Sequence, residues 1–301
     1  MDNSLEALLT AANQIILGKS QQIKLAVCCL LGQGHLLIED IPGVGKTTLS
    51  HTLAKLFGMD YQRIQFTSDI LPADIIGCSV FNPDTHQFSF HPGPIFNQMI
   101  LADEINRSTP KAQSALLEAM EEGQVTVEGQ TYPLPEPFFV IATQNPVHQL
   151  GTFPLPESQL DRFLMRIKLG YPNHQAEREL LTGIQRHQLI DDLPVLLEPE
   201  SLAGLQKQVH EIYASPALLD YLQAIIDFSR QSDDFACGLS PRAGLGLLNA
   251  AKAWAFMQQR QAVMPEDIQA VLPSVAGHRL QPGNTDAEMT VAPILQQVPV
   301  L

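Results

Sequence analysis

The residues best suited to chemistry lie early in the chain, in the stretch Pro42-Gly43-Val44-Gly45-Lys46-Thr47-Thr48. The two glycines allow the backbone to turn with its N–H groups pointing inward, which makes an anion site at the start of a helix. Lys46 is suited to bind the β- and γ-phosphates of a nucleotide, and the Thr47 hydroxyl is suited to bind Mg²⁺. Asp40 stands where the strict pattern has its first glycine, so a plain glycine turn with a solvated lysine is the alternative.

A second group of polar residues follows the apolar run at 98–102, which ends in Asp103 and Glu104. If this run is a buried strand of a parallel sheet, the two carboxylates lie at the edge where such sheets bind ligands. Asp103 would then hold Mg²⁺ through its water shell. Glu104 would orient or deprotonate the water that attacks the γ-phosphate. A strand that simply ends in acidic loop residues is the alternative.

Asn145 closes another apolar run, at 138–143. Its side-chain amide could bind both the γ-phosphate and the attacking water. An ordinary turn residue before a proline is the alternative, and asparagine–proline pairs favour it when taken alone.

The elements that must position these groups follow from the spacing of apolar residues. Strands are predicted at 35–38, 61–66, 98–102, 138–143 and 163–169, with helices at 4–17, 20–31, 48–57 and 110–122. Turn signals predict two β-hairpins, at 79–90 and 124–132. Everything after residue 173 has helical spacing. The pattern predicts an α/β core with a parallel sheet over residues 1–172 and an all-helical domain over 173–301.

Composition narrows the class of protein. The chain has 301 residues, of which 45% are hydrophobic and 17% charged, with a formal net charge of −14, which is typical of a soluble globular protein. The acidic balance makes nucleic-acid binding an unfavoured function, because phosphate neutralisation needs a concentrated basic face. No cluster has zinc-site spacing, so we expect no structural metal. The longest apolar run, at 25–31, is too short to span a bilayer, and we expect a cytoplasmic protein.

Taken together, the motifs resemble those of the MoxR family of AAA+ ATPases. The resemblance extends over nearly the whole chain and rests on an ordered set: Gly43-Val44-Gly45-Lys46-Thr47, Leu101-Ala102-Asp103-Glu104, Ala142-Thr143-Gln144-Asn145-Pro146, Asp161-Arg162-Phe163 and Ser240-Pro241-Arg242. It implies an αβα nucleotide-binding core, a helical lid, and assembly into a ring that is usually hexameric. ATP, with Mg²⁺, would be hydrolysed between the subunits.

The resemblance also implies roles for single residues. Asn145 matches the family's sensor 1, and Arg242 matches sensor 2, which reaches the phosphates from the lid. Arg162 matches the finger offered to the neighbour's nucleotide, with Arg166 as the second choice for that role. An ordinary ion pair of Arg162 with Asp161 or Glu157 is the alternative. The two hairpins match insertions that line ring pores or contact client proteins.

One segment departs from the family pattern. Between Pro146 and Gly151 the family usually carries two acidic residues, whereas this chain has Val147-His148-Gln149-Leu150. Whether the acids serve subunit contact or support of the loop, that role is in doubt here. We interpret His148 as a surface loop residue rather than as a pH-sensitive replacement.

Two classes of function remain. The first is a chaperone-like ATPase that remodels or activates partner protein complexes, with a von Willebrand factor A domain protein as a potential adaptor. The second is a nucleotide-gated assembly scaffold with little turnover, and a DNA-acting motor is a less favoured variant of the first. The presence of both Asp103 and Glu104 favours hydrolysis.

Overall fold

The computed structural model describes residues 3–84, 86–145, 153–182, 186–280 and 286–300. At its centre is a five-stranded sheet in the order β2-β5-β8-β1-β9, and each neighbouring pair is parallel. Its strands are β1 (Leu36–Glu39), β2 (Tyr61–Gln65), β5 (Met99–Asp103), β8 (Phe139–Gln144) and β9 (Met165–Ile167). Because all strands run the same way, their carboxyl ends meet at one edge, as the predicted α/β class requires.

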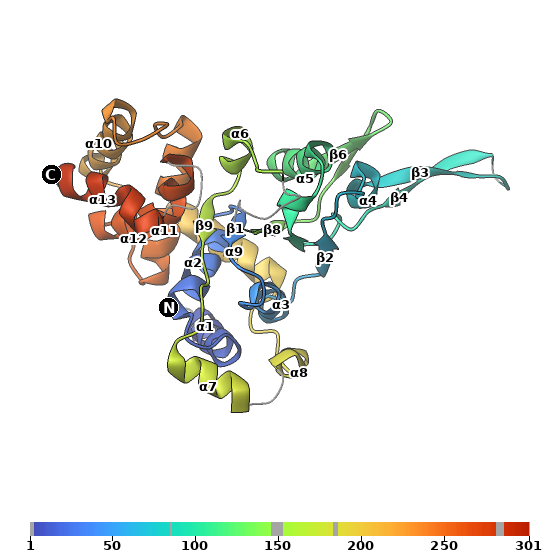
Figure 1. Ribbon diagram of the computed structural model, residues 1–301, viewed down its shortest axis with the longest axis horizontal. Helices are drawn as coiled ribbons and strands as arrows, with labels where there is room; N and C mark the ends of the chain where they lie inside the picture. Colours follow the sequence, from blue (N-terminus) through green and yellow to red (C-terminus); the bar gives the residue numbers. More distant parts are fainter. Residues whose placement is uncertain (1–2, 85, 146–152, 183–185, 281–285, 301) are drawn as a thin grey trace.

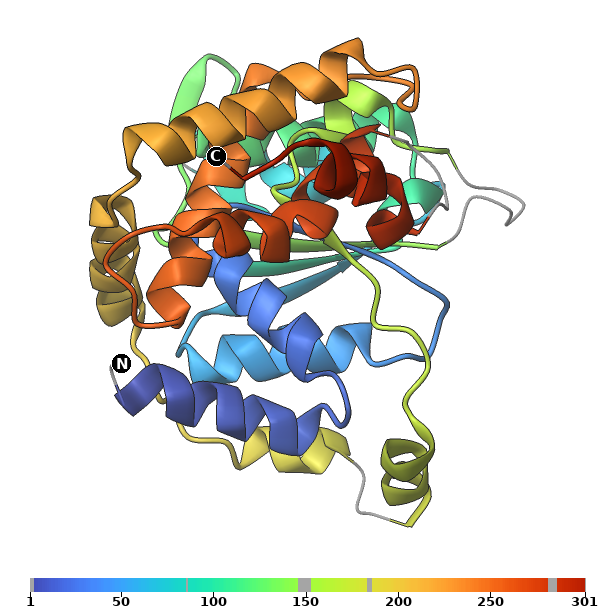
Figure 2. The same ribbon diagram turned by 90° about the vertical axis from the view of Figure 1, so that its left-hand side faces the viewer.

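Alternating side chains of the sheet enter two different hydrophobic clusters. In β1, Leu36 and Ile38 belong to one cluster and Leu37 to the other. The first cluster includes α1 (Asn3–Ile15), α2 (Ser20–Leu31) and α3 (Lys46–Leu56); the second includes α4 (Pro72–Ile76) and α5 (Pro110–Glu122). Helices therefore cover both faces of the sheet (Figure 2), and strands buried on both faces explain the continuous apolar runs in the sequence.

Two antiparallel hairpins leave this core, as predicted. They are formed by β3 (Gly77–Asn82) with β4 (Gln87–Pro92), and by β6 (Gln124–Val127) with β7 (Gln130–Pro133). The β3–β4 hairpin projects far from the body of the molecule (Figure 1). The rings of Phe90 and Tyr132 stack with centroids 4.2 Å apart, so the two hairpins contact each other. Gly77 has φ +94°, and a Cβ there would lie 2.2 Å from the His91 carbonyl oxygen, so only glycine fits.

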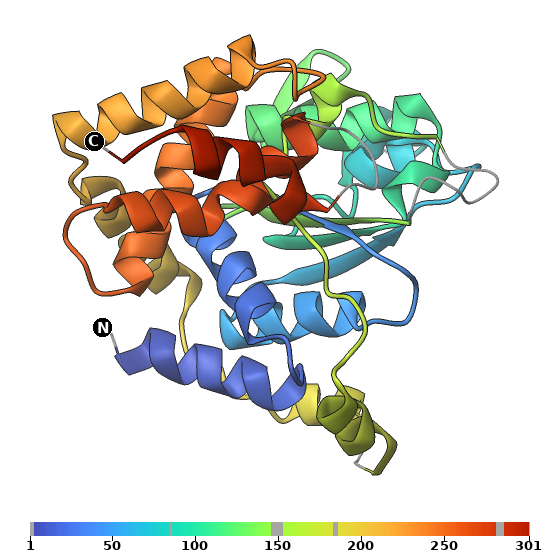
Figure 3. The ribbon, with the colours of Figure 1, turned by 60° about the vertical axis from the view of Figure 1, so that its left-hand side comes forward.

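Beyond the sheet the described chain is helical. After the short α6 (Glu157–Leu160) and strand β9 come α7 (His174–Thr182), α8 (Arg186–Asp191), α9 (Pro199–Glu211), α10 (Pro216–Gln231), α11 (Pro241–Met257), α12 (Pro265–Leu280) and α13 (Ala287–Gln297). Helix α12 packs against β9, and α11 packs against α2 and α9 (Figure 3). The α/β core with a helical lid is thus confirmed, and the exact boundary near residue 172 stays a prediction. None of the described helices is long and apolar enough to cross a membrane.

Candidate functional site

The glycine loop has the strand–turn–helix context that the sequence predicts. It follows β1, and helix α3 begins at Lys46, two residues before the predicted start. Gly43 and Gly45 have φ of +85° and +96°, and no atom lies within 4 Å of a Cβ built at either position. Positive φ favours glycine at both positions. The first N–H groups of α3 have no intrahelical partner, so they are available to an anion at the loop.

Lys46 is held at this edge of the sheet and is not solvated. The residue is 8% exposed, and its Nζ donates to the Asp40 carbonyl oxygen at 2.7 Å and to Asn145 Oδ1 at 3.5 Å. Burial lowers the pKa of Lys46, and the nearby carboxylates of Asp103, Asp40 and Glu104 oppose that shift. The alternative of a glycine turn with a solvated lysine therefore does not describe this loop.

Asp40 has a structural role that the sequence did not reveal. Its Oδ1 accepts a hydrogen bond from its neighbour Ile41 N at 2.8 Å, and its Oδ2 accepts one from Gly170 N at 2.5 Å. Next to this contact, Lys19 Nζ donates to the Tyr171 carbonyl oxygen at 2.6 Å. The residue that replaces the first loop glycine thus connects the start of the loop to the segment that follows β9.

Asp103 ends strand β5 and is fixed from two sides. Its Oδ2 accepts from Arg63 Nε at 3.1 Å and from Nη2 at 2.7 Å, and its Oδ1 accepts from Thr143 Oγ1 at 2.6 Å. The same Thr143 oxygen accepts the backbone N–H of Glu104 at 2.8 Å. Thr143 and Arg63 therefore orient the acidic pair. Thr143 lies in a motif quoted above and Arg63 in the predicted strand 61–66, but nothing in their local pattern indicates this role.

Glu104 leaves the strand in a left-handed conformation, with φ +57°, which a non-glycine residue adopts only rarely. Its Oε1 accepts from Asn145 Nδ2 at 2.8 Å, and its Oε2 accepts from Arg107 Nη1 at 2.9 Å and from Gln65 Nε2 at 3.1 Å. Asn145 therefore joins Glu104 to Lys46. Three predicted groups from three separate segments meet at the carboxyl edge of the sheet.

Arg162 and Arg242 do not lie beside the glycine loop. They lie at the opposite edge of the sheet, where the amino ends of the strands meet. Arg162 precedes β9, whose Met165 pairs with the first residue of β1, whereas the glycine loop follows the last residue of β1. Arg162 Nη2 lies 3.0 Å from Glu121 Oε2, and the guanidinium of Arg242 binds the other oxygen of the same carboxylate. Within one chain, neither arginine is brought to the loop, and the ion-pair partner of Arg162 is Glu121 rather than Asp161 or Glu157.

Arg166, the second candidate for the finger, does not face outward. Its side chain is 4% exposed on β9, and its Nη1 lies 2.8 Å from Oε2 of Glu39, which is 1% exposed. A guanidinium held in the interior by a buried carboxylate cannot reach a neighbouring subunit, so this choice is wrong. The departures at His148 and Leu150 lie outside the described residues.

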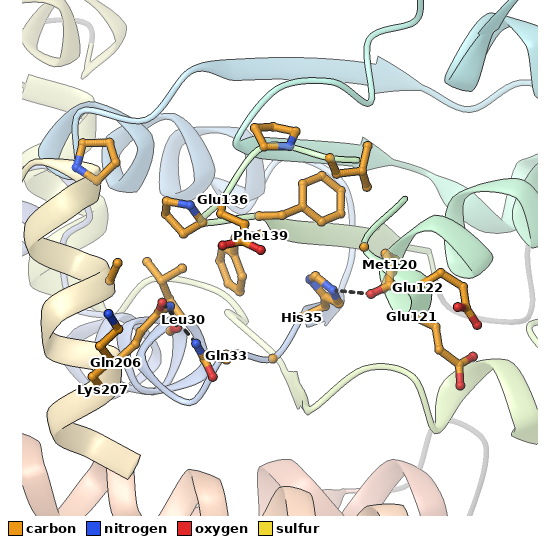
Figure 4. Close-up of a pocket in the computed structure, with 18 of the residues that line it drawn as sticks. Leu30, Gln33, His35, Met120, Glu121, Glu122, Glu136, Phe139, Gln206 and Lys207 are labelled. Atoms are coloured by element: carbon orange, nitrogen blue, oxygen red, sulfur yellow. Dashed lines mark hydrogen bonds between the residues drawn. The ribbon is translucent and has the colours of Figure 1, made fainter. Parts of the chain in front are cut away.

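A cavity of about 580 Å³ lies beside Glu121 and is not the nucleotide site (Figure 4). His35 borders it at the start of β1, donating from Nε2 to the Met120 carbonyl oxygen at 3.2 Å and accepting the Val140 N–H at Nδ1 at 3.1 Å. Burial lowers the pKa of His35 to about 4, so the imidazole is neutral near pH 7. Its contacts hold α5 against the sheet, on the side that carries the two arginines.

Comparison with known proteins agrees with this geometry. Residues 35–165 match the model of the ATPase family associated with various cellular activities (AAA), and residues 227–298 match the AAA lid domain. The chain is 46% identical to the uncharacterized protein YeaC of Bacillus subtilis, over 89% of this chain and 84% of that one. It is 39% identical to the chaperone MoxR1 of Mycobacterium tuberculosis, over 92% and 76% of the two chains. It is 32% identical to the protein MoxR of Paracoccus denitrificans, over 90% of this chain and 86% of that one.

A solved structure gives the same result. The crystal structure of a candidate ATPase from Cytophaga hutchinsonii matches with a TM-score of 0.88 at 34% identity, covering 99% of this chain and 95% of that one.

Proposed function

This chain belongs to the MoxR family of AAA+ ATPases, and we propose that it is an ATP-hydrolysing chaperone that remodels or activates partner protein complexes. The observation that carries the proposal is the hydrogen-bonded link from Lys46 through Asn145 to Glu104. It connects the group suited to bind the terminal phosphate with the group suited to activate the attacking water. Asn145 is then the residue that aligns the two.

Thr47 and Asp103 are the residues that would hold Mg²⁺. Hydroxyl and carboxylate oxygens are hard donors, so the residues present fit this ion. Bound Mg²⁺ supplies positive charge that neutralises the phosphates. In this proposal Lys46 binds the β- and γ-phosphates, the N–H groups of the loop at 42–48 cradle them, and Glu104 accepts the proton of the attacking water.

Arg162 and Arg242 serve the nucleotide of a neighbouring subunit in this proposal. Two features support it: both guanidiniums lie at the sheet edge opposite their own loop, and both share Glu121. The Nε–H of Arg162 has no acceptor among the described residues. A subunit with its loop on one edge and its arginines on the other can complete sites only through head-to-tail interfaces, and we propose that these close into a hexameric ring. Hydrolysis would then depend on assembly.

The client and its adaptor belong to the same proposal. The β3–β4 hairpin exposes Phe81 and Phe88, whose rings lie 5.3 Å apart, and exposed aromatic residues on a projecting hairpin suit contact with a protein client. We propose a cytoplasmic protein client, with a von Willebrand factor A domain protein as adaptor.

The test is the ATP hydrolysis rate per subunit, measured across a wide range of protein concentration. We expect the rate to rise and then plateau, because neighbours complete the sites. Lys46→Ala should lose ATP binding, and Glu104→Gln should bind ATP and lose turnover. Lys55→Ala, at the far end of the same helix, is the matched control and should behave as wild type.

Normal turnover in both site variants would refute the assignment of the site. Normal ATP binding without turnover, at every concentration and with a candidate partner present, would instead favour the assembly scaffold. One observation supports the scaffold as the second candidate function. The Glu104 carboxylate accepts from three side-chain donors, and some of these hydrogen bonds must break before it can act on a water.

A further inference from the structure

Arg279 of helix α12 uses every hydrogen-bond donor that it has. Its Nε donates to Asp161 Oδ1 at 2.7 Å, and its Nη2 donates to the carbonyl oxygens of Asp161 at 3.1 Å and of Phe163 at 2.7 Å. Its Nη1 donates to the carbonyl oxygen of Leu164 at 3.1 Å and to that of Val275. A guanidinium carries five N–H groups, so this one is saturated. Its side chain is only 6% exposed.

Four of these five bonds go to one short segment, residues 161–164, between α6 and β9. This segment contains Arg162 and lies outside any helix or strand. The backbone N–H groups of residues 161–164 all donate to backbone carbonyl oxygens of α6 or of His35, just before β1, so their partners are already provided by the core. The carbonyl oxygens of Asp161, Phe163 and Leu164 accept from Arg279, so the guanidinium from the lid fixes the acceptor side of this segment. Arg162 contrasts with it, because its side chain is 28% exposed and its Nε has no acceptor among the described residues.

The contacts of Arg279 with Asp161 also extend to the start of the helix that carries Arg242. Asp161 Oδ2 accepts from Ser240 Oγ at 3.0 Å, while Asp161 Oδ1 binds Arg279. Ser240 caps helix α11 by accepting the Ala243 N–H at 3.0 Å, and Arg242 lies in the first turn of that helix. One carboxylate thus ties the backbone around Arg162 to the helix start that carries Arg242.

We propose that Arg279 is a positioning residue for the transfer of the phosphoryl group: it sets the backbone of residues 161–164 so that Arg162 points at the nucleotide of the neighbouring subunit. The proposal rests on the role of Arg162 proposed above. An inserted arginine is worth on the order of 10³ to 10⁵ in rate, and a misplacement of about 1 Å can cost on the order of 10². Lysine cannot replace Arg279, because it has three donors on a compact ammonium instead of a planar fork of five.

The test begins with Arg279→Lys, which keeps the charge beside Asp161. We expect near-normal ATP binding, a normal oligomeric state, and turnover per subunit lower by about 10². Arg260→Lys is the matched control, because Arg260 pairs with Asp267 at the other end of the same helix and does not contact residues 161–164. It should keep wild-type turnover. If Arg279→Lys does not fold, Asp161→Asn takes its place, since it keeps the size of the acceptor and removes its charge.

Mixing subunits separates positioning from general damage. A Glu104→Gln subunit has a dead site but intact arginines, and an Arg279→Lys subunit has an intact site but a misplaced Arg162. In a random equal mixture about one interface in four joins an intact site to intact arginines, so activity should return to about a quarter of the wild-type rate. An Arg162→Ala protein mixed with Glu104→Gln in parallel should recover equally.

Each outcome of these measurements either supports or overturns the positioning role of Arg279. Recovery in both mixtures supports the positioning role. Recovery with Arg162→Ala but not with Arg279→Lys, or full turnover of Arg279→Lys alone, overturns the role of Arg279 and leaves the proposed function standing. If Arg162→Ala keeps full turnover or is not rescued, the proposed action of Arg162 on a neighbour fails, and the role of Arg279 fails with it.

Discussion

The side-chain amide of Asn145 donates a 2.8 Å hydrogen bond to the carboxylate of Glu104, and its oxygen faces the ammonium of Lys46 at 3.5 Å. One amide therefore contacts both a candidate base and a candidate phosphate ligand. These residues come from the ends of β5 and β8 and from the start of α3. Neutral amides can make both contacts at once, because they carry a donor and an acceptor on the same group.

Asn145→Ala should lower turnover while leaving the nucleotide bound. Losing one aligned polar group at a reacting centre costs on the order of 10² to 10³ in rate, and we expect that loss in steady-state ATP hydrolysis. ATP binding, measured by calorimetry, should stay within a few-fold of wild type because Lys46 and the loop remain. Asn249→Ala, in helix α11, is the control. A loss of binding as large as the loss of turnover would contradict a role in alignment.

ATP affinity should fall at alkaline pH earlier than for a site with an ordinary lysine. Burial lowers the pKa of Lys46 below its usual 10.5, so its ammonium loses the proton at a lower pH than an exposed lysine does. Affinity for phosphates should therefore fall as pH rises through that lowered pKa. The measurement is the Kd for ATP between pH 7 and 10.5, with Lys46→Arg as the variant that does not titrate. Affinity that is constant over this range would contradict the prediction.

His35 should make the fold sensitive to acid. Its pKa in the folded state is about 4, against 6.5 in the unfolded chain, so the folded state binds a proton less readily. The stability that the neutral form of His35 contributes is fully present above pH 6.5, and it is lost as pH falls from 6.5 to about 4. Between pH 7 and 5 the loss is at most about 2 kcal/mol, because the unfolded chain takes up nearly one proton at His35 over this interval while the folded state takes up little.

The measurement for His35 is urea unfolding at pH 7 and at pH 5, for wild type and for His35→Gln. Glutamine can keep a donor and an acceptor without titrating, so the drop in unfolding free energy between the two pH values should be smaller in the variant. An equal drop in both proteins would show that another group is responsible.

Arg166→Met should destabilise the fold rather than the subunit interface. It leaves the carboxylate of Glu39 buried without its partner, which costs about 3 to 5 kcal/mol of unfolding free energy. The double variant Glu39→Gln with Arg166→Met removes the buried charge and should recover most of that loss. Chemical unfolding measures both. If the single variant is as stable as wild type, the ion pair does not have the structural importance that its burial indicates.

Local sequence was enough to predict most of the nucleotide site. Glycines before Lys46, a carboxylate pair after an apolar run, and Asn145 after another are short-range patterns, and each is set by backbone geometry within a few residues. Once the runs form a parallel sheet, their ends must meet at one edge, so the contact of Glu104 with Asn145 follows from the topology. The α/β class and both hairpins were predictable for the same reason.

Only the tertiary structure shows which of the arginines are buried in the fold and which are available to a neighbouring subunit. Arg162 and Arg166 are both basic residues four positions apart in a mixed segment, and no local pattern separates them. The difference comes from distant partners: Arg166 is buried against Glu39 on the neighbouring strand, whereas Arg162 reaches Glu121 at the end of α5. Arg279 was not predicted at all, because four of its five acceptors become neighbours only when α12 packs against β9. The periodicity of apolar residues shows which face of an element is buried. It does not show which charged residue from a distant part of the chain packs against that face.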